Sequence, residues 1–231
     1  MKKYLIPTLA LGLMAASVTA ADKPDLKNPT KKASYAIGLD IGNNFKRQEV
    51  QIDAAALSAG ISDALAGKTE LTEAESKEAL AKFRQDMMAK VTERQKATGE
   101  KNQKAGDEFL AANAKKAGVK TTASGLQYKV IKSGTGKTPK ATDTVKTHYH
   151  GTLIDGTVFD SSVQRGEPVT FPVNGVIPGW QEALQLMKEG DKWQVYVPGK
   201  LAYGERGAGG QIGPNATLIF DVELISIEKG N

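Results

Sequence analysis

Three aromatic residues, Tyr149, Trp180 and Phe220, stand in sequence contexts that predict an apolar binding pocket. Trp180 opens a helical pattern in which Trp180, Leu184 and Met187 recur at i, i+4 and i+7. Tyr149 and Phe220 each belong to an alternating pattern typical of a strand. If those strands form one sheet covered by the helix, the three rings converge on one concavity. A plainer alternative is that Trp180 belongs to the core, as most tryptophans on helix faces do.

The usual groups for covalent or acid–base catalysis are scarce in this sequence. It has no cysteine, which excludes thiol catalysis, disulfides and zinc–cysteine sites. Its two histidines, His148 and His150, lie at i and i+2 on one predicted strand and therefore on one face. If Tyr149 points into the pocket, both histidines point away from it, and no carboxylate is spaced to complete a metal site. We therefore interpret them as solvated strand residues, which also disfavours a Ser–His–acid hydrolase.

The elements that would position the aromatic residues can be predicted from the same patterns. Alternating stretches predict an antiparallel sheet with one covered face, and they span residues 126–130, 145–150, 192–197 and 218–224. One short helix follows the apolar stretch 176–180 and stops before Gly190. A single helix packed on a sheet of this kind makes an α+β half-barrel.

Five motifs in this region, in order and in register, resemble those of the FK506-binding-protein (FKBP) prolyl isomerases. They are residues 149–153 (YHGTL), 155–162 (DGTVFDSS), 176–180 (VIPGW), 202–204 (AYG) and 216–224 (ATLIFDVEL). The match runs from about Gly125 to the C-terminus. The preceding segment resembles the macrophage infectivity potentiator (Mip) branch of that family. The resemblance implies an FKBP half-barrel over residues 118–231, peptidyl-prolyl cis-trans isomerase activity, and no cofactor or metal.

The family's site residues can be transferred to matching positions of this sequence. The resemblance implies that Asp160, Tyr203, Tyr149 and Phe220 are catalytic and that Phe159, Val169, Val176, Ile177, Trp180, Ile212 and Arg165 bind substrate. Trp180 would form the floor under the proline ring. The Ile177 N–H and the Tyr203 hydroxyl would each bind a substrate carbonyl. Asp160 would lie at the rim, held by Tyr149 and Arg165, although Asp160 read alone fits a simple turn.

Two positions depart from the family pattern. Val169 stands where an aromatic residue is common, so one wall of the pocket would be more open and the preference for the residue before proline could change. Ala208 stands where some relatives carry a histidine, in a glycine-rich loop that we expect to be mobile. Ile212 would keep the apolar contact of this loop.

An X–Pro isomerase needs neither a nucleophile nor a proton donor. The partial double bond of the amide creates a barrier of about 20 kcal/mol. A dry pocket that fits the twisted amide, with donors for the peptide carbonyls, lowers that barrier. Each ~1.4 kcal/mol of preferential binding to the twisted state gives a tenfold gain in rate.

The N-terminal residues predict an exported protein. Residues 1–20 have a basic start, an apolar centre and a small-residue cleavage site, which together indicate a signal peptide, so that the mature chain begins near Ala21. A retained anchor helix is the alternative, but the apolar centre is short, and no later stretch could span a bilayer. Residues 21–32 are polar and predict a disordered lead-in. With the Mip-like resemblance, we expect a periplasmic or outer-membrane-associated protein.

Residues 33–91 predict an all-α domain that dimerises. Ile37, Ile41 and Phe45 form one apolar stripe, Asp53 is a suitable N-cap for a second helix, and residues 72–75 form a capping box for a third. These short helices cannot bury much apolar surface alone, so a second copy is the simplest partner. Packing back onto the isomerase domain is the alternative. The Mip-like resemblance implies the same N-terminal homodimer.

Residues 92–117 predict a connecting stalk helix, because no proline interrupts the helix while the apolar stripe vanishes from Thr92 to Glu108. Phe109 and Leu110 then restore apolar character. A helix that is polar all round usually bridges domains through solvent. If continuous with the third helix, it would be about 60 Å long. Gly99 and Gly106 are expected to weaken it.

The net charge and the family resemblance together limit the classes of binding partner that we expect. The formal charge is +5, and removal of Lys2 and Lys3 with the signal peptide leaves +3, which does not favour nucleic acid. The expected ligands are proline-containing unfolded or folding polypeptides, with FK506 and rapamycin as inhibitors implied by the resemblance. A chaperone or adhesive module is the rival hypothesis, in which the dimer cleft matters more than catalysis. Such a binder would tolerate the loss of Asp160 or Tyr203.

Overall fold

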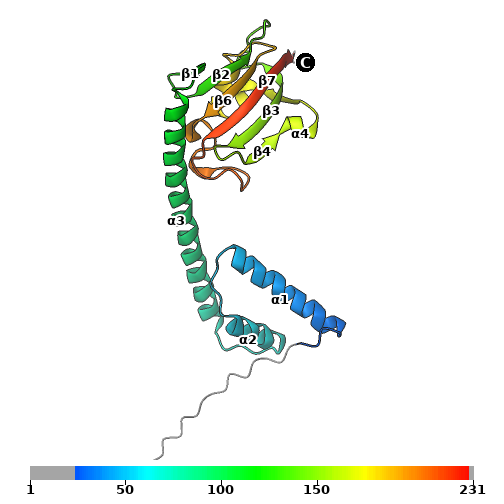
Figure 1. The fold of residues 1–231 in the computed structure, drawn as a ribbon. Helices are drawn as coiled ribbons and strands as arrows, with labels where there is room; N and C mark the ends of the chain where they lie inside the picture. Colours follow the sequence, from blue (N-terminus) through cyan, green and yellow to red (C-terminus); the bar gives the residue numbers. More distant parts are fainter. Residues whose placement is uncertain (1–23, 229–231) are drawn as a thin grey trace, which may run out of the picture. The chain divides into compact units, whose positions relative to one another are not determined.

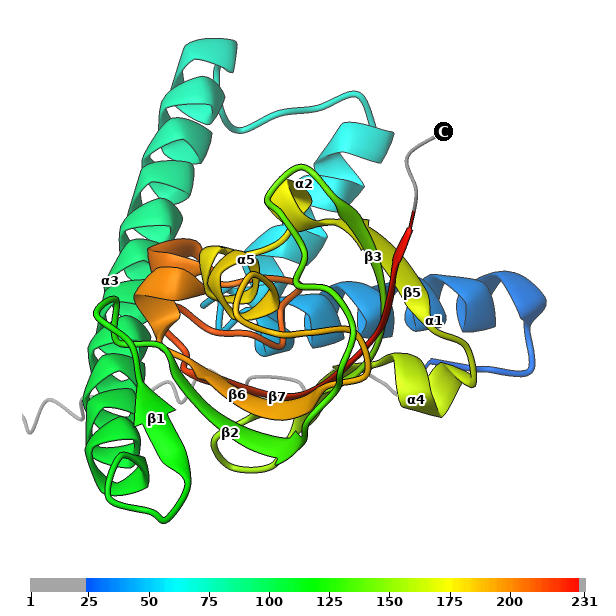
Figure 2. The ribbon, with the colours of Figure 1, turned by 90° about the horizontal axis from the view of Figure 1, so that it is seen from above.

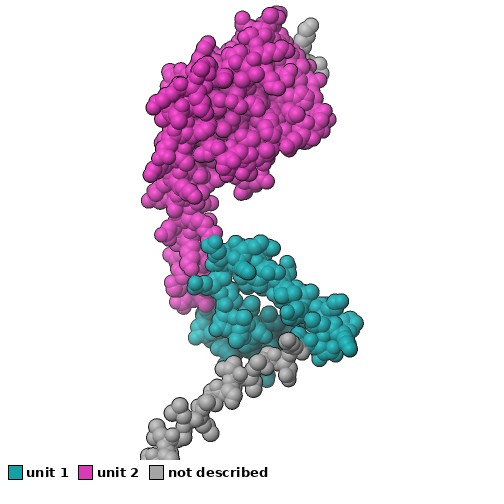
Figure 3. All heavy atoms as spheres, in the orientation of Figure 1, with its two compact units in different colours: residues 1–76 teal, residues 77–231 magenta. Residues whose placement is uncertain are grey.

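The computed structural model describes residues 24–228 and divides into two compact units, residues 1–76 and 77–231, which Figure 3 colours separately. The predicted signal peptide, residues 1–20, lies outside the described residues. The division differs from the predicted boundaries, which separated a stalk, 92–117, from the isomerase domain. The stalk falls into the same unit as the sheet because its C-terminal half packs on the sheet, as described below.

The first unit contains helices α1 (Pro29–Arg47) and α2 (Ala54–Leu65). Helix α1 begins four residues before the predicted start at Ala33, so the prediction of a disordered lead-in is wrong for residues 29–32. The cause is local, since the Asn28 side chain accepts hydrogen bonds from two first-turn amides and Pro29 occupies the first turn. The predicted cap of α2 is confirmed, with the Ala56 N–H donating to Asp53 at 2.8 Å.

Neither α1 nor α2 contains a buried residue. Most of their large apolar side chains stay exposed, to 61% for Ile37, 50% for Ile61 and 86% for Leu65, while Ile41 and Phe45 are half-buried. These helices therefore carry apolar faces that the unit itself does not cover. Among residues 24–228, no helix has both the length and the apolar character needed to cross a bilayer.

Helix α3 (Glu73–Asn113) is continuous over 41 residues, or about 60 Å (Figure 1). Its predicted capping box is confirmed, because the Thr72 N–H donates to the Glu75 carboxylate at 2.8 Å and the Glu75 N–H donates to Thr72 Oγ1 at 3.2 Å. The helix ends at Asn113, four residues before the predicted end of the stalk.

Seven antiparallel strands form one sheet in the second unit. They are β1 (Val119–Thr121), β2 (Gln127–Lys132), β3 (Thr144–Leu153), β4 (Val158–Ser161), β5 (Val169–Pro172), β6 (Lys192–Val197) and β7 (Leu218–Glu228), ordered β1-β2-β6-β7-β3-β4 with β5 also paired to β3. The sheet curves around the short helix α5 (Pro178–Leu184), as Figure 2 shows from above. The predicted α+β half-barrel is confirmed.

The core lies between the concave face of the sheet and α5. On β3 the buried residues Val145, Thr147 and Tyr149 alternate with half-buried ones, as predicted. Helix α5 is shorter than its pattern suggested and ends at Leu184, so the fully buried Met187 lies in the following turn. Gly190 adopts a φ of +90° in the turn before β6, a conformation that favours glycine.

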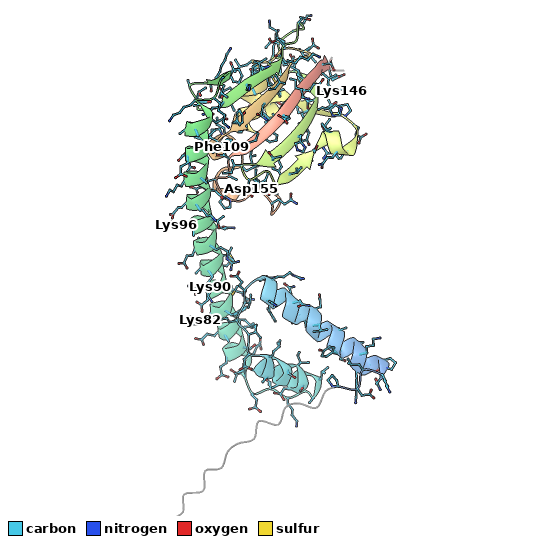
Figure 4. The ribbon with its side chains drawn as sticks, viewed as in Figure 1. Lys82, Lys90, Lys96, Phe109, Lys146 and Asp155 are labelled. Atoms are coloured by element: carbon cyan, nitrogen blue, oxygen red, sulfur yellow. The ribbon has the colours of Figure 1, made fainter. Side chains whose placement is uncertain are left out.

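The C-terminal half of α3 packs on the other face of the sheet, so the prediction that the stalk is surrounded by solvent is wrong there. Gly106 is buried, and a Cβ atom added to it would overlap the Thr217 hydroxyl. Phe109, labelled in Figure 4, lies with its ring 6.0 Å from that of Tyr196. At the end of the helix, the buried Asn113 amide donates to Gln127 at 3.0 Å. Small and polar residues thus form a packing face together with the aromatic Phe109.

Candidate active site

An aromatic cavity of about 290 Å³ opens on the concave side of the sheet. Its lining residues come from β3, β4, β5, β7, the segment 175–177 before α5, the first turn of α5 and the loop after β6. They are Tyr149, Phe159, Asp160, Phe171, Gly175, Val176, Ile177, Trp180, Tyr203 and Phe220. Eight of the eleven residues predicted for the site are thereby brought together.

Trp180 forms the floor of the cavity. It lies in the first turn of α5, where Pro178 is tolerated because it lacks an N–H that would in any case have no helical partner. Its ring is 5% exposed and makes edge-to-face contacts with Tyr149, Phe171 and Phe220, at centroid distances of 5.5, 6.0 and 5.2 Å. This geometry is the one that aromatic quadrupoles favour, and it fixes the floor rigidly.

Gly151 allows two walls of the cavity to meet. It pairs with Phe220 across β3 and β7, and a Cβ atom there would lie 2.7 Å from the Phe159 ring and 3.0 Å from the Phe220 ring. Without that atom, Phe159 and Phe220 approach each other to 5.5 Å between centroids at an interplanar angle of 84°. A larger residue at 151 would displace one of these rings.

A polar cluster of Tyr149, Asp160 and Arg165 closes one side of the cavity. The Tyr149 hydroxyl donates to the Asp160 carboxylate, Arg165 forms an ion pair with the same carboxylate, and Arg165 Nη2 donates to the Tyr149 oxygen at 2.9 Å. Arg165 is the last residue of helix α4 (Ser162–Arg165), and Ser161 is the N-cap of that helix. The side chain of Asp160 is 42% exposed, so the carboxylate faces both the cavity and solvent.

The pKa values in this cluster follow from its contacts. Burial by itself would raise the pKa of Asp160, but the hydrogen bonds from Tyr149 and Arg165 and the guanidinium charge outweigh it and hold that pKa below its ordinary value. Burial, with the hydrogen bond to Asp160, raises the pKa of the Tyr149 hydroxyl. Asp160 is therefore ionised and Tyr149 is neutral at pH 7.

Two further groups could bind carbonyl oxygens. The Ile177 N–H precedes the first turn of α5 and has no hydrogen-bond acceptor within the described part of the chain. Tyr203 lines the cavity with its side chain 42% exposed, between two short helical turns, Gly199–Leu201 and Gly204–Arg206. Both donors flank the aromatic floor.

Three predicted site residues do not line the cavity. Arg165 lies behind Asp160, and Ile212 is buried, its backbone paired with Ala208 in both directions. Val169 packs against the core, and the wall predicted to be open there is supplied by Phe171, two residues further along the same face of β5. Phe171 and Gly175 were missed. The alternation of Val169 and Phe171 was the available signal for the first, while nothing in the sequence indicated Gly175.

The two histidines are half-buried and do not line the cavity, as expected if Tyr149 points into it, and each also contacts a serine hydroxyl. Nδ1 of His148 lies 3.1 Å from the Ser162 hydroxyl, and Nδ1 of His150 lies 3.0 Å from the Ser161 hydroxyl. Both histidines therefore brace the chain that follows Asp160. Among residues 24–228, no cluster of three or more His, Cys, Asp or Glu side chains is arranged to hold a metal ion.

This arrangement can bind an apolar ring carried by a peptide. Comparison with known proteins identifies the class of protein to which the chain belongs. The sequence-family model described as FKBP-type peptidyl-prolyl cis-trans isomerase matches residues 135–225. A second family model, described as the domain amino-terminal to that isomerase, matches residues 30–130. The chain belongs to the FKBP-type peptidyl-prolyl cis-trans isomerase family.

Relatives in this family match nearly the whole chain. The outer membrane protein MIP of Legionella longbeachae is 48% identical over 99% of both chains. The peptidyl-prolyl cis-trans isomerase Mip of Coxiella burnetii is 47% identical over 99% of this chain and 100% of its own. The crystal structure of FkpA from Escherichia coli has a TM-score of 0.72 and 40% identity, covering 89% of this chain and 99% of that one.

Proposed function

We propose that this protein accelerates X–Pro isomerisation in exported polypeptides and that the aromatic cavity is its active site. Family membership carries the isomerase activity. The observation that ties the activity to this cavity is the enclosure of Trp180 by three edge-to-face rings, which leaves a rigid apolar floor on which a proline ring can rest.

The proposed mechanism is preferential binding of the twisted amide. The proline ring rests on Trp180, which removes the X–Pro bond from water. The Ile177 N–H and the Tyr203 hydroxyl hold carbonyl oxygens on either side of that bond. The Asp160 carboxylate, ionised and fixed by Tyr149, faces the carbonyl that rotates. No covalent bond forms and no proton moves, so the rate gain comes from fit and from fixed dipoles.

The experiment that tests this site is isomerisation of a short X–Pro peptide by the mature chain and four variants. Asp160→Ala and Tyr203→Phe remove the proposed contacts. Asp155→Ala removes an exposed carboxylate that caps only its own turn. Tyr128→Phe removes a hydroxyl from a ring stacked on Trp193, at a centroid distance of 4.3 Å and outside the cavity.

We expect at least tenfold losses of kcat/KM in Asp160→Ala and Tyr203→Phe, with the two controls within twofold of the unchanged chain. Melting temperatures measured alongside separate lost catalysis from unfolding. Equal activity in all five proteins would refute the assignment of the site, and no acceleration by the folded parent chain would refute the isomerase proposal.

We further propose that the first unit forms a homodimer. The supporting observation is the uncovered apolar surface of α1 and α2, which line a groove of about 530 Å³ with Ile41, Phe45, Leu57 and Ile61 among its residues. A second copy is the partner always present at the right concentration. Sedimentation should give a monomer for Ile61→Glu and a dimer for Ala55→Glu, whose position does not line this groove. A monomeric parent chain would refute the proposal.

The proposal extends to location and inhibitors. The predicted signal peptide and the relative named an outer membrane protein support a periplasmic or outer-membrane-associated site. Membership of the FKBP family supports FK506 and rapamycin as ligands of the same cavity, and we expect them to compete with peptide substrate. The rival chaperone function is favoured by the exposed apolar helices of the first unit. Suppression of aggregation that survives Tyr203→Phe would assign that function to a separate surface.

A further inference from the structure

The C-terminal half of α3 touches the loop that carries Tyr203, a member of the cavity. The contact lies between one face of the helix, at Thr98, Gly99 and Asn102, and the end of that loop, residues 213–215, which we call the stem. Gly99 is buried, whereas Thr98 and Asn102 are half-buried. Helix and stem both belong to the second compact unit.

Asn102 makes the directional contact. Its Nδ2 donates to the Pro214 carbonyl at 2.8 Å, a bond between residues 112 positions apart in the sequence. Gly99 provides the close approach, since a Cβ atom there would lie 3.3 Å from both the Pro214 ring and the Asn215 amide. On the loop side, a Cβ atom at Gly213 would lie 2.9 Å from Asn102 Nδ2. The stem is therefore fixed against the helix by one hydrogen bond and by tight packing.

The stem in turn holds the residues around Tyr203. The Asn215 N–H donates to the Gly204 carbonyl at 2.8 Å, and Gly204 directly follows Tyr203. The backbone of Asn215 also lies so close to Gly199 that a Cβ atom there would be 2.5 Å from the Asn215 oxygen. The stem is thus placed between α3 and the segment 199–204. A fixed stem therefore holds the backbone before Tyr203, at Gly199, and directly after it, at Gly204.

The loop needs such an anchor. Gly204, Gly207, Gly209 and Gly210 all have positive φ angles, between 56° and 73°, so the loop is built from the residue type with the largest conformational freedom. The Tyr203 side chain is 42% exposed and receives little packing of its own. Its direction therefore depends on the backbone on either side of it.

We propose that Asn102 is a positioning residue for the isomerase site, acting through Pro214, Asn215 and Gly204 on Tyr203. The C-terminal half of α3 is then part of the catalytic unit as well as a connector. This inference rests on the proposed role of Tyr203 in holding a substrate carbonyl. It predicts that the sequence of α3 affects turnover although no residue of α3 lines the cavity.

The test is a double-mutant cycle in the full mature chain, with Asn102→Ala, Tyr203→Phe and the double variant. Gln103→Ala is the matched control, because its amide bonds only to Asp107 on the exposed side of the same helix, at 2.9 Å. Kinetics with an X–Pro peptide are combined with the backbone amide signals of residues 203–207 in 15N NMR spectra. Gly213→Ala disturbs the same contact from the loop side and replaces Asn102→Ala if that variant melts below the assay temperature.

We expect Asn102→Ala to lower kcat/KM about fivefold and to shift the amide signals of 203–207, while Gln103→Ala changes neither. In the Tyr203→Phe background, Asn102→Ala should cost less than twofold, because the group through which it acts is already gone. Unchanged kinetics and unchanged amide signals in Asn102→Ala would overturn the inference. It would also be overturned if the loss of kcat/KM in the double variant equalled the product of the losses in the two single variants. A Tyr203→Phe variant with unchanged activity would instead refute the role of the hydroxyl, and Asn102 could still be judged from the amide signals.

Discussion

Replacement of Gly106 by alanine tests whether α3 packs on the sheet in solution, because the two alternatives predict opposite signs. On a helix surrounded by solvent, Gly→Ala raises stability by about 1 kcal/mol through helix propensity. In the structure, Gly106 is buried, and an added Cβ atom would overlap the hydroxyl of Thr217 and lie 3.2 Å from its Cβ atom.

The size of the effect follows from these contacts. Thr217 is 4% exposed and β-branched, so its side chain has little room to rotate away. Inserting a methyl group into such a site costs about 1–3 kcal/mol. After the gain in helix propensity, the expected loss of unfolding free energy for Gly106→Ala is about 1 kcal/mol. Gly99→Ala, with its nearest contacts at 3.3 Å, should be close to neutral.

Tryptophan fluorescence during chemical denaturation is a suitable assay. Both tryptophans of the chain, Trp180 and Trp193, lie in the core of the second unit, so the signal reports on that unit. Lys104→Ala, at an exposed position of α3, is the control and should change the free energy by less than about 0.5 kcal/mol. A Gly106→Ala variant that is more stable by about 1 kcal/mol would refute the packing of α3 on Thr217.

Three further predictions concern the cavity. Trp180→Ala should lower the unfolding free energy by about 3–5 kcal/mol and abolish isomerisation, measured by denaturation with Trp193 as reporter and by the peptide assay. The pKa of Asp160 is lower in the folded chain than in the unfolded chain, where it is about 3.9. The ionised carboxylate therefore stabilises the fold at pH values above about 3.9, and this contribution is lost as the pH falls through the pKa of the folded chain. Thermal melts between about pH 2 and 5 should therefore decline less steeply for Asp160→Asn than for the parent chain, and equal slopes would contradict the ion pair. Tyr149→Phe should lower kcat/KM severalfold while costing no more than about 1 kcal/mol of stability, since Asp160 is 42% exposed; calorimetry showing a much larger loss would mean that the hydroxyl serves the fold more than the site.

Local signals in the sequence were sufficient for the starts of α2 and α3 and for most of the cavity, whereas the cap of α1 at Asn28 was missed. The caps at Asp53 and Thr72 involve side chains and amides within three residues of each other, so both could be identified from spacing. The alternation on β3 likewise fixed which residues face the core. The five motifs then brought eight of the eleven predicted residues to the cavity, because each motif already contained the residues that line it.

The sequence did not indicate in the same way which residue of β5 forms a wall of the cavity. Val169 and Phe171 lie on the same face of a four-residue strand, and alternation makes them equivalent. Which of them reaches the cavity depends on how β5 pairs with β3, where Phe171 lies opposite Val145 and Val169 lies opposite Thr147. That register is set by contacts with the rest of the sheet and not by the strand itself.

The sequence by itself determined the α+β class, the caps of α2 and α3 and the aromatic composition of the site, since each depends on residues that are close in the chain. The tertiary structure alone decided that α3 packs on the sheet and reaches the Tyr203 loop. Apart from Phe109, its contact face consists of residues such as Gly99, Asn102 and Gly106, which carry no hydrophobic periodicity. Close packing of a helix backbone on a sheet requires small side chains, and small side chains leave no apolar pattern from which the contact could have been predicted.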